Sequence, residues 1–345
     1  MFYTDQEGGL QVIYSEGSGS WSRADPSTIA SDVHPGSPVT ASIISDYVYI
    51  FYVDLNNTIQ GLYGAPSSTS TNWIVHPIAS QELQTSDGLF IRTCVTTDNS
   101  TKTSMYLYYV DQHNVVQKYA FTGYPALEMM RMEDLPNLIG TREIECQFAG
   151  GVETLWTLNE ASRLTSWYRP EATKGEWTKG YTSTETALEA SSILSISDTT
   201  TNRTHIVFQN TQQRMQQYDF DGFGAFQTLV GNTIHSEVTS GTRLTTWANN
   251  GYCGESVNIY YQMGNTSDLY YSAFRDQYSS SYYYNYGSTG APTYTTEDTV
   301  MPLVRTYGKN AGKKKHVGKT LKIVIIVVVV IISLFILCCC CGLCA

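Results

Sequence analysis

The sequence predicts an all-β fold, a six-bladed β-propeller of four-stranded blades, followed by a single C-terminal transmembrane α-helix. Three observations predict it. An aromatic-rich motif recurs about every fifty residues through most of the chain. The chain has 26 tyrosines among 345 residues, and Tyr, Thr and Val fit the pleated, half-buried surface of a sheet. A long apolar run lies close to the C-terminus.

The charge is unevenly distributed along the chain. All 31 acidic residues and 14 of the 21 basic residues lie in residues 1–304, which therefore carry a net charge of −17, whereas the seven later basic residues give +7. An acidic body repels phosphates, so nucleic acid is not expected as a partner. Only 15% of the residues are charged and 12% are aromatic, which excludes a disordered chain, a coiled coil and collagen.

The repeat is clearest in Phe51-Tyr52-Val53-Asp54 and its copy Tyr108-Tyr109-Val110-Asp111, and Phe2-Tyr3-Thr4-Asp5 is the first copy. The anchor aromatic of each copy lies at position 3, 52, 109, 156, 208 or 261, with spacings of 49, 57, 47, 52 and 53. One period that runs through the whole body indicates a repeat architecture.

Each unit carries the signals of four strands. Turn formers such as Asn56-Asn57 separate the anchor from an aliphatic and a second aromatic, which predicts a hairpin. A third aromatic usually follows in a further strand. Before each of the five later anchors comes a run that we expect to form the innermost strand. These runs are Val39–Ile44, Leu89–Val95, Ile144–Phe148, Ile193–Ile196 and Leu244–Trp247.

A four-stranded sheet repeated radially is the blade of a propeller. We therefore expect a propeller over residues 1–304, with repeats near 1–42, 43–95, 96–148, 149–198, 199–250 and 251–304. The first blade has no segment for its innermost strand. Either Thr299–Thr306 returns to complete that blade, or the N-terminus is incomplete.

The apolar run predicts a membrane anchor. Ile323 to Leu337 is apolar except for Ser333, and the following residues extend the run to 343, long enough to cross about 30 Å of hydrocarbon. A buried core helix, the alternative, would show a polar face. Residues 305–322 form a basic juxtamembrane linker, and the positive-inside rule predicts that its lysines and the propeller face the cytosol.

A rival topology places the propeller outside the cytosol. Asn310-Ala311-Gly312, a polar spacer and the apolar tail match the outline of a GPI-attachment signal, which requires a signal peptide that this N-terminus does not show. The tail cysteines are either palmitoylation sites or small apolar residues at a helix end. They are Cys338, Cys339, Cys340 and Cys341. Cys94, Cys146 and Cys253 are too widely spaced to predict a disulfide framework or a zinc site.

Three stretches carry a family resemblance. Residues 49–54 with Asn56-Asn57 and Ile59 match a strand and its turn, Tyr218–Gly222 matches an Asp-Gly turn, and Gly36–Ala41 matches the entry to an innermost strand. In these features residues 1 to about 300 resemble the fungal fucose-specific lectin family. The resemblance implies a six-bladed propeller that binds a sugar between blades, with an Arg and a Glu on its hydroxyls and an aromatic ring on its apolar side.

Carried over position by position, the charged partners are lost. The Arg position, three before the anchor, is Tyr49, Tyr106, Glu153, His205 or Asn258, and the Glu position is Val12, Gly61, Lys118, Ser166, Gln217 or Tyr271. The aromatic position survives as Trp21, Trp73, Trp177 and Phe226. These four aromatics, with His205 and Gln217 as the least altered polar pair, are the candidate ligand-binding residues. Blade core is the alternative role for the aromatics.

The sequence therefore favours a membrane-anchored, lectin-like propeller that binds carbohydrate through an altered site. The alternative is a non-catalytic scaffold for proteins at a membrane surface, and a glycosidase is a third hypothesis. No catalytic or cofactor-binding motif is found, and Asp219 and Asp221 before Gly222 indicate a hairpin turn rather than a calcium site. Four N-glycosylation sequons suit a secretory protein but discriminate little in a chain so rich in Ser and Thr. They begin at Asn56, Asn99, Asn202 and Asn265.

Overall fold

A computed structural model describes the chain in segments. The chain divides into two units, Met1–Leu303 and Val304–Ala345. The described residues all belong to the first unit. They are 2–4, 8–15, 21–44, 46–65, 72–86, 90–97, 103–122, 128–135, 138, 143–170, 176–189, 191–198, 202–224, 227–235, 238, 240, 244–249, 256–262, 269–275 and 299–300.

Strands dominate these residues and form six antiparallel sheets within the described part of the chain. Sheet 1 contains β1 (Phe2–Thr4), β2 (Leu10–Ser15) and β3 (Trp21–Ala30). Sheet 2 contains β4 (Thr40–Ile44), β5 (Tyr47–Val53), β6 (Ile59–Gly64) and β7 (Ile74–Val75). Sheet 3 contains β8 (Ile91–Thr97), β9 (Thr103–Val110), β10 (Val116–Thr122) and β11 (Glu128–Leu135).

The remaining sheets repeat the same order. Sheet 4 contains β12 (Glu143–Ala149), β13 (Val152–Leu158), β14 (Arg163–Pro170) and β15 (Thr178–Thr186). Sheet 5 contains β16 (Ile193–Asp198), β17 (Arg203–Gln209), β18 (Met215–Asp221) and β19 (Gln227–His235). Sheet 6 contains β20 (Thr245–Asn249), β21 (Ser256–Gln262), β22 (Leu269–Arg275) and β23 (Thr299–Val300).

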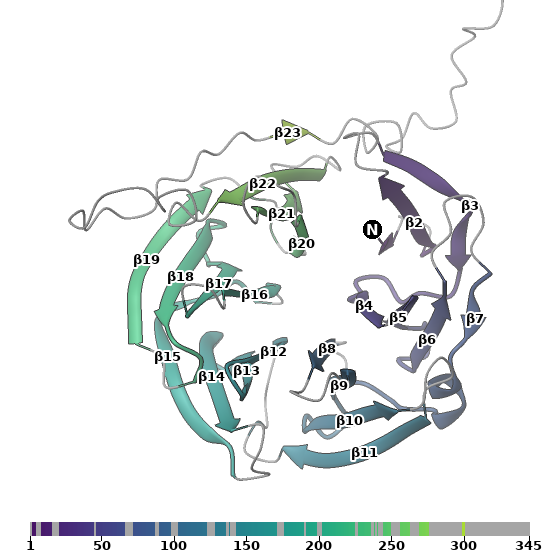
Figure 1. Cartoon of the computed structure of the whole chain (residues 1–345), viewed down its shortest axis with the longest axis horizontal. Coiled ribbons are helices and arrows are strands. Elements are labelled where there is room, and N and C mark those ends of the chain that lie inside the picture. The colour runs from purple at the N-terminus through teal and green to yellow at the C-terminus, as the bar shows by residue number, and fades with distance from the viewer. Residues whose placement is uncertain are drawn as a thin grey trace, which may run out of the picture. The chain divides into compact units, whose positions relative to one another are not determined.

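The sheets lie around a common centre, and the first strands of sheets 2 to 5 face inward (Figure 1). Neighbouring inner strands β4, β8, β12 and β16 contact one another in that order. An all-β propeller is therefore confirmed. The five runs predicted as innermost strands coincide with β4, β8, β12, β16 and β20 to within a few residues.

In sheets 2 to 5 the hairpin after the anchor strand is built by one recurrent turn. Asp54 Oδ1 accepts hydrogen bonds from the backbone N–H groups of Asn56 and Thr58, at 2.8 and 2.9 Å, and Asn57 has a positive φ of 60°. Asp and Asn favour such turns because their side chains bond the backbone two residues on. Sheets 3 to 5 repeat the turn with Asp111, Asn159 and Asn210.

The apolar core lies between neighbouring sheets. Tyr49 and Phe51 of β5 pack with Leu107 and Phe121 across the boundary between sheets 2 and 3. His76 lies in the same cluster, fully buried, and its Nδ1 accepts the Ile78 N–H at the start of a 3₁₀ helix, η1 (Pro77–Gln81). Burial lowers the pKa of the His76 imidazole to about 4. This buried ring is therefore neutral at pH 7.

The inner strands are also joined by polar and covalent contacts. A disulfide joins Cys94 of β8 to Cys146 of β12, with the two Cα atoms 5.9 Å apart. Arg92 and Glu145 form an ion pair between the same strands, and Ser195 of β16 donates to Glu145 over 3.3 Å. The sequence interpretation missed this disulfide because it compared the cysteines along the chain rather than across blades. Cys253 lies outside the described residues.

Two further expectations concern the ends of the chain. The return of Thr299–Thr306 to the first blade is wrong at its first two residues, because Val300 and Thr299 pair with Tyr270 and Tyr271 of β22 and complete sheet 6. No helix in the described residues is long and apolar enough to span a membrane. The predicted helix at 323–343, with the tail cysteines, lies outside those residues.

Candidate binding positions between the blades

The positions that the lectin resemblance singled out lie on the second and third strands of each sheet. The residue three before each anchor faces a definite partner on the next strand: Tyr49 faces Tyr63 in sheet 2, Glu153 faces Arg169 in sheet 4 and His205 faces Asp219 in sheet 5. The two tyrosine rings are stacked with centroids 5.9 Å apart. One position in the repeat therefore holds three different chemistries.

Between sheets 3 and 4 two of these positions, Lys118 and Glu153, form a largely buried ionic cluster with Arg169, Tyr108 and the partly exposed Glu133. Lys118 Nζ lies 2.5 Å from Glu153 Oε1, and Arg169 Nε donates to Glu153 Oε2 over 2.9 Å. Arg169 also donates two bonds to the carboxylate of Glu133, at 3.0 and 2.5 Å. The Tyr108 hydroxyl donates to Glu153. Lys118 and Glu153 are each only 3% exposed.

The cluster balances two cations against two carboxylates, which is the condition for burying charges without a large penalty. Burial lowers the pKa of the Lys118 ammonium, and Glu153 opposes that shift. Burial, followed by the charge of Glu153, raises the pKa of Tyr108 well above its usual value. Tyr108 therefore stays protonated and donates its hydrogen to the shared carboxylate.

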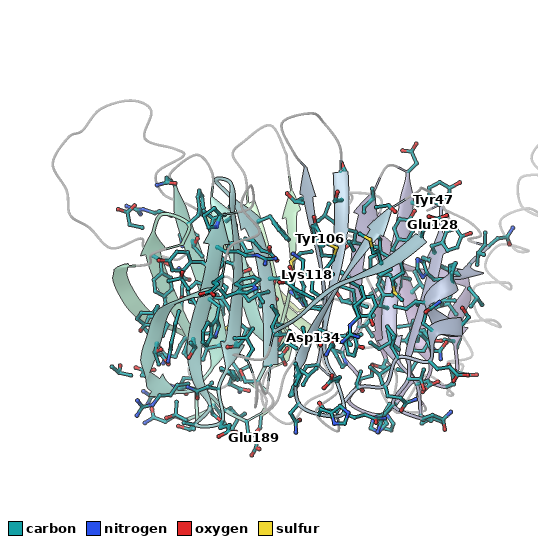
Figure 2. All side chains as sticks on the ribbon, turned by 90° about the horizontal axis from the view of Figure 1, so that it is seen from below. Tyr47, Tyr106, Lys118, Glu128, Asp134 and Glu189 are labelled. Carbon is teal, nitrogen blue, oxygen red and sulfur yellow. A yellow bond between two sulfur atoms is a disulfide. The ribbon has the colours of Figure 1, made fainter. Side chains whose placement is uncertain are left out.

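The same cations cover the aromatic rings of this boundary. Arg169 Cζ lies 4.5 Å from the centroid of the Trp177 ring, and Lys118 Nζ lies 4.2 Å from that of Tyr106. The Tyr106 ring stacks on Phe148 at 5.2 Å. Figure 2 shows Tyr106 and Lys118 partway along the strands, between their two ends. The ring of Trp177, which was predicted to contact a ligand, is therefore covered by Arg169 of the same chain.

The ionic cluster inverts the charges that the resemblance requires. Glu153 occupies the Arg position of the fourth repeat, and Lys118 occupies the Glu position of the third. The two side chains bind each other instead of remaining available to a ligand. Sequence reasoning found neither Arg169 nor Glu133, whose roles depend on which strands face each other across the blade boundary.

In sheet 5 the structure brings His205 and Gln217 together through Asp219. Asp219 Oδ1 lies 2.8 Å from His205 Nδ1 and accepts a bond from Gln217 Nε2 over 2.5 Å. All three side chains are buried. The turn assignment is correct for Gly222, which directly follows β18. It is wrong for Asp219, which lies inside β18 and binds the predicted pair, and Asp221 is the last residue of that strand.

The other predicted aromatics have different surroundings. The Trp73 ring makes an edge-to-face contact with Phe2, with centroids 5.7 Å apart, at the boundary of sheets 1 and 2. Trp21 begins β3, but its side chain is not among those described, and Phe226 lies outside the described residues. Trp73 and Trp177 both pack on blade core.

A polar groove of about 380 Å³ lies elsewhere, between the end of β15 and the turn that joins β17 to β18. Its lining includes Glu185, Asn210, Gln212, Arg214 and Gln216. Asn210 Oδ1 accepts the N–H groups of Gln212 and Arg214, which fixes this turn. In the described part of the chain, no three His, Cys, Asp or Glu side chains are grouped to hold a metal ion.

Comparison with solved structures identifies the architecture. The lectin of Aleuria aurantia, a six-bladed β-propeller with a novel mode of fucose recognition, matches with a TM-score of 0.64 and 14% identity over 84% of this chain and 91% of the lectin. The shared fold is a β-propeller. AofleA from Arthrobotrys oligospora matches with a TM-score of 0.62 and 15% identity over 79% of this chain and 78% of that protein.

A bacterial lectin has the same fold. The BP39L lectin from Burkholderia pseudomallei matches with a TM-score of 0.57 and 13% identity, over 85% of this chain and 80% of the lectin. No protein-family model and no curated protein sequence matches the chain. At these identities the likeness establishes the fold and leaves the ligand to be argued from the residues.

Proposed function

We propose that this chain is a membrane-anchored, lectin-like, six-bladed propeller that binds carbohydrate through an altered site. The observation that supports it most is the fold shared with the Aleuria aurantia lectin, which covers 84% of this chain and 91% of the lectin. The ionic cluster between sheets 3 and 4 does not match the fucose-binding pattern, because its charges are reversed and bound to each other.

The polar groove is the proposed binding site. Its volume of about 380 Å³ falls within the usual range for small-molecule sites, about 300–1,000 Å³. Glu185 accepts hydrogen bonds and Arg214 donates them in a planar fork, so together they complement the vicinal hydroxyls of a sugar. Both side chains are exposed, whereas His205 and Gln217 are buried within sheet 5.

A glycan array probed with the full chain tests the proposal. We expect binding to at least one glycan, and loss of that binding in Arg214→Ala and Glu185→Gln. Arg131→Ala is the matched control, because Arg131 is also exposed but lies on β11 of sheet 3. Binding that survives both groove variants but is lost in His205→Asn moves the site to the predicted polar pair. No signal on any glycan refutes carbohydrate binding.

A scaffold that binds proteins without catalysis is the second candidate. The ionic cluster favours it, because at least one position between blades is filled by this chain's own side chains. Retained membrane association together with a silent glycan array would support this function. We expect no turnover of aryl glycosides in either case, and turnover would revive the glycosidase hypothesis.

The membrane anchor is proposed from the apolar run at 323–343. A helix of that length spans about 30 Å of hydrocarbon. We expect the full chain to stay with membranes after alkaline carbonate extraction, and a chain that ends before Ile323 to be released. Release of the full chain under the same conditions refutes the anchor.

A further inference from the structure

The disulfide between sheets 3 and 4 bears on where the propeller folds. Cys94 and Cys146 occupy facing positions on neighbouring inner strands, with Cα atoms 5.9 Å apart, a separation typical of bonded cysteines. Both are buried, at 8% and 4% exposure, among Tyr108, Ile144 and Leu155. Disulfides of this structural kind form in oxidising compartments and are rare in the cytosol.

Two of the four sequons lie in described residues, and their asparagines are exposed. Asn56 lies in the turn between β5 and β6, and Asn202 lies in the turn between β16 and β17. These two turns lie at opposite ends of the strands. Figure 2 shows Tyr47, where β5 starts, near one end of the strands, so the turn after β5 lies near the other end. It shows Glu189, just before β16, near that other end, so the turn after β16 lies at the same end as Tyr47. A glycan on either asparagine would project into solvent.

The threonines of these sequons are buried and serve the fold. Thr58 accepts a bond from Gln84 Nε2 over 2.6 Å. Thr204 donates to the Gly222 carbonyl over 3.1 Å and accepts from Gln147 over 3.0 Å. Contacts within the fold therefore account for the threonines, but they do not account for the exposed asparagines at positions 56 and 202.

We propose that the propeller folds in an oxidising compartment outside the cytosol and that Asn56 and Asn202 carry N-linked glycans. The two thiols lose two electrons and two protons to a disulfide-containing oxidant, which is reduced to a dithiol. Each asparagine amide nitrogen forms a bond to the anomeric carbon of a lipid diphosphate-linked oligosaccharide. The bond from that carbon to the diphosphate oxygen breaks, the amide loses one proton and the diphosphate leaves. This topology departs from the one that the linker lysines favour.

The test uses the full chain expressed in eukaryotic cells, and its result does not depend on whether the propeller binds sugar. Peptide:N-glycosidase digestion in ¹⁸O-labelled water converts each glycosylated asparagine to labelled aspartate, which peptide mass spectrometry assigns to a position. We expect the label at Asn56 and Asn202. Asn56→Gln and Asn202→Asp should each remove one glycan, and the controls Thr58→Ser and Thr204→Ser should keep both, since they keep the sequon and the hydroxyl.

Thiol alkylation of the same sample tests the disulfide. Cys94 and Cys146 should resist a maleimide in the denatured, unreduced chain and react after reduction. Absence of label at all four sequons, with both thiols reactive before reduction, overturns the proposal. Label confined to Asn99 or Asn265 overturns the assignment to Asn56 and Asn202, and thiols that react before reduction in a glycosylated chain overturn the argument from the disulfide.

Discussion

Glu153 should be the most sensitive residue of the ionic cluster. Its carboxylate accepts from Lys118, Tyr108 and Arg169, and it is 3% exposed. Glu153→Gln keeps the shape but removes the negative charge. Arg169 keeps both bonds to Glu133, whereas Lys118 loses its buried ion pair. Removing one partner of such a pair costs about 3–5 kcal/mol, so we expect a loss of unfolding free energy of that size at pH 7.

The loss should depend on pH. Without Glu153, burial depresses the pKa of Lys118 further, so the unfolded chain binds more protons than the folded one below the usual lysine pKa. The unfolding free energy of the variant should therefore rise from pH 7 toward pH 10. A merely steric defect would not produce this rise.

Urea unfolding of the full chain, followed by tryptophan fluorescence, measures these effects. Lys118→Met/Glu153→Gln should cost at least about 1 kcal/mol less than the sum of the single variants, because each removes the charge that the other leaves unpaired. Arg131→Ala, which breaks an exposed pair with Asp134, should cost less than about 1 kcal/mol. An additive double variant, or a Glu153→Gln chain as stable as the parent, would refute the assignment of the cluster.

Three further predictions concern the core. Burial lowers the pKa of His76 to about 4, so the unfolded chain binds a proton at this imidazole from about pH 6.5 downward, before the folded chain does. The unfolding free energy should therefore fall by about 3 kcal/mol as the pH drops from about 6.5 to 4, and His76→Asn should abolish this loss. Burial raises the pKa of Glu145 to about 7, against the opposing charge of Arg92. Between about pH 4.5 and 7 the folded chain therefore binds more protons than the unfolded one, so the unfolding free energy should fall as the pH rises through this range, and Glu145→Gln should flatten that slope. Replacing Cys94 and Cys146 by Ser opens a 52-residue loop and should cost about 4 kcal/mol on chain entropy, and an unchanged urea midpoint would contradict the disulfide.

The strands were predictable because each one is local. The run Val39–Ile44 became β4 at Thr40–Ile44, although hydrophobicity alone would not give its burial pattern, because Thr40 and Ser42 are buried and Ile43 is exposed. Asp54 and Asp111 also signal their turns within a few residues. A repeat multiplies such local signals, so the all-β propeller followed from the sequence.

The contacts between blades were harder to predict because they join different repeats. Lys118 and Glu153 are 35 residues apart, and their pairing depends on which strands face each other. One signal was present: the two residues hold opposite charges at the two positions that the resemblance aligned. A second was the spacing of Cys94 and Cys146, which are separated by 52 residues, close to one repeat. Arg169 and Glu133 gave no comparable signal, because they lie outside the aligned positions.

The coupling of sheets 3 and 4 has a consequence for how this propeller can change over generations. A ring of similar repeats can gain, lose or exchange one unit by recombination when each unit carries its own complete set of contacts. Here sheet 3 supplies Lys118 and Cys94, and sheet 4 supplies Glu153 and Cys146. Exchange of either blade alone would leave an unpaired charge and an unpaired thiol in the core, so the two blades can be inherited only as a pair.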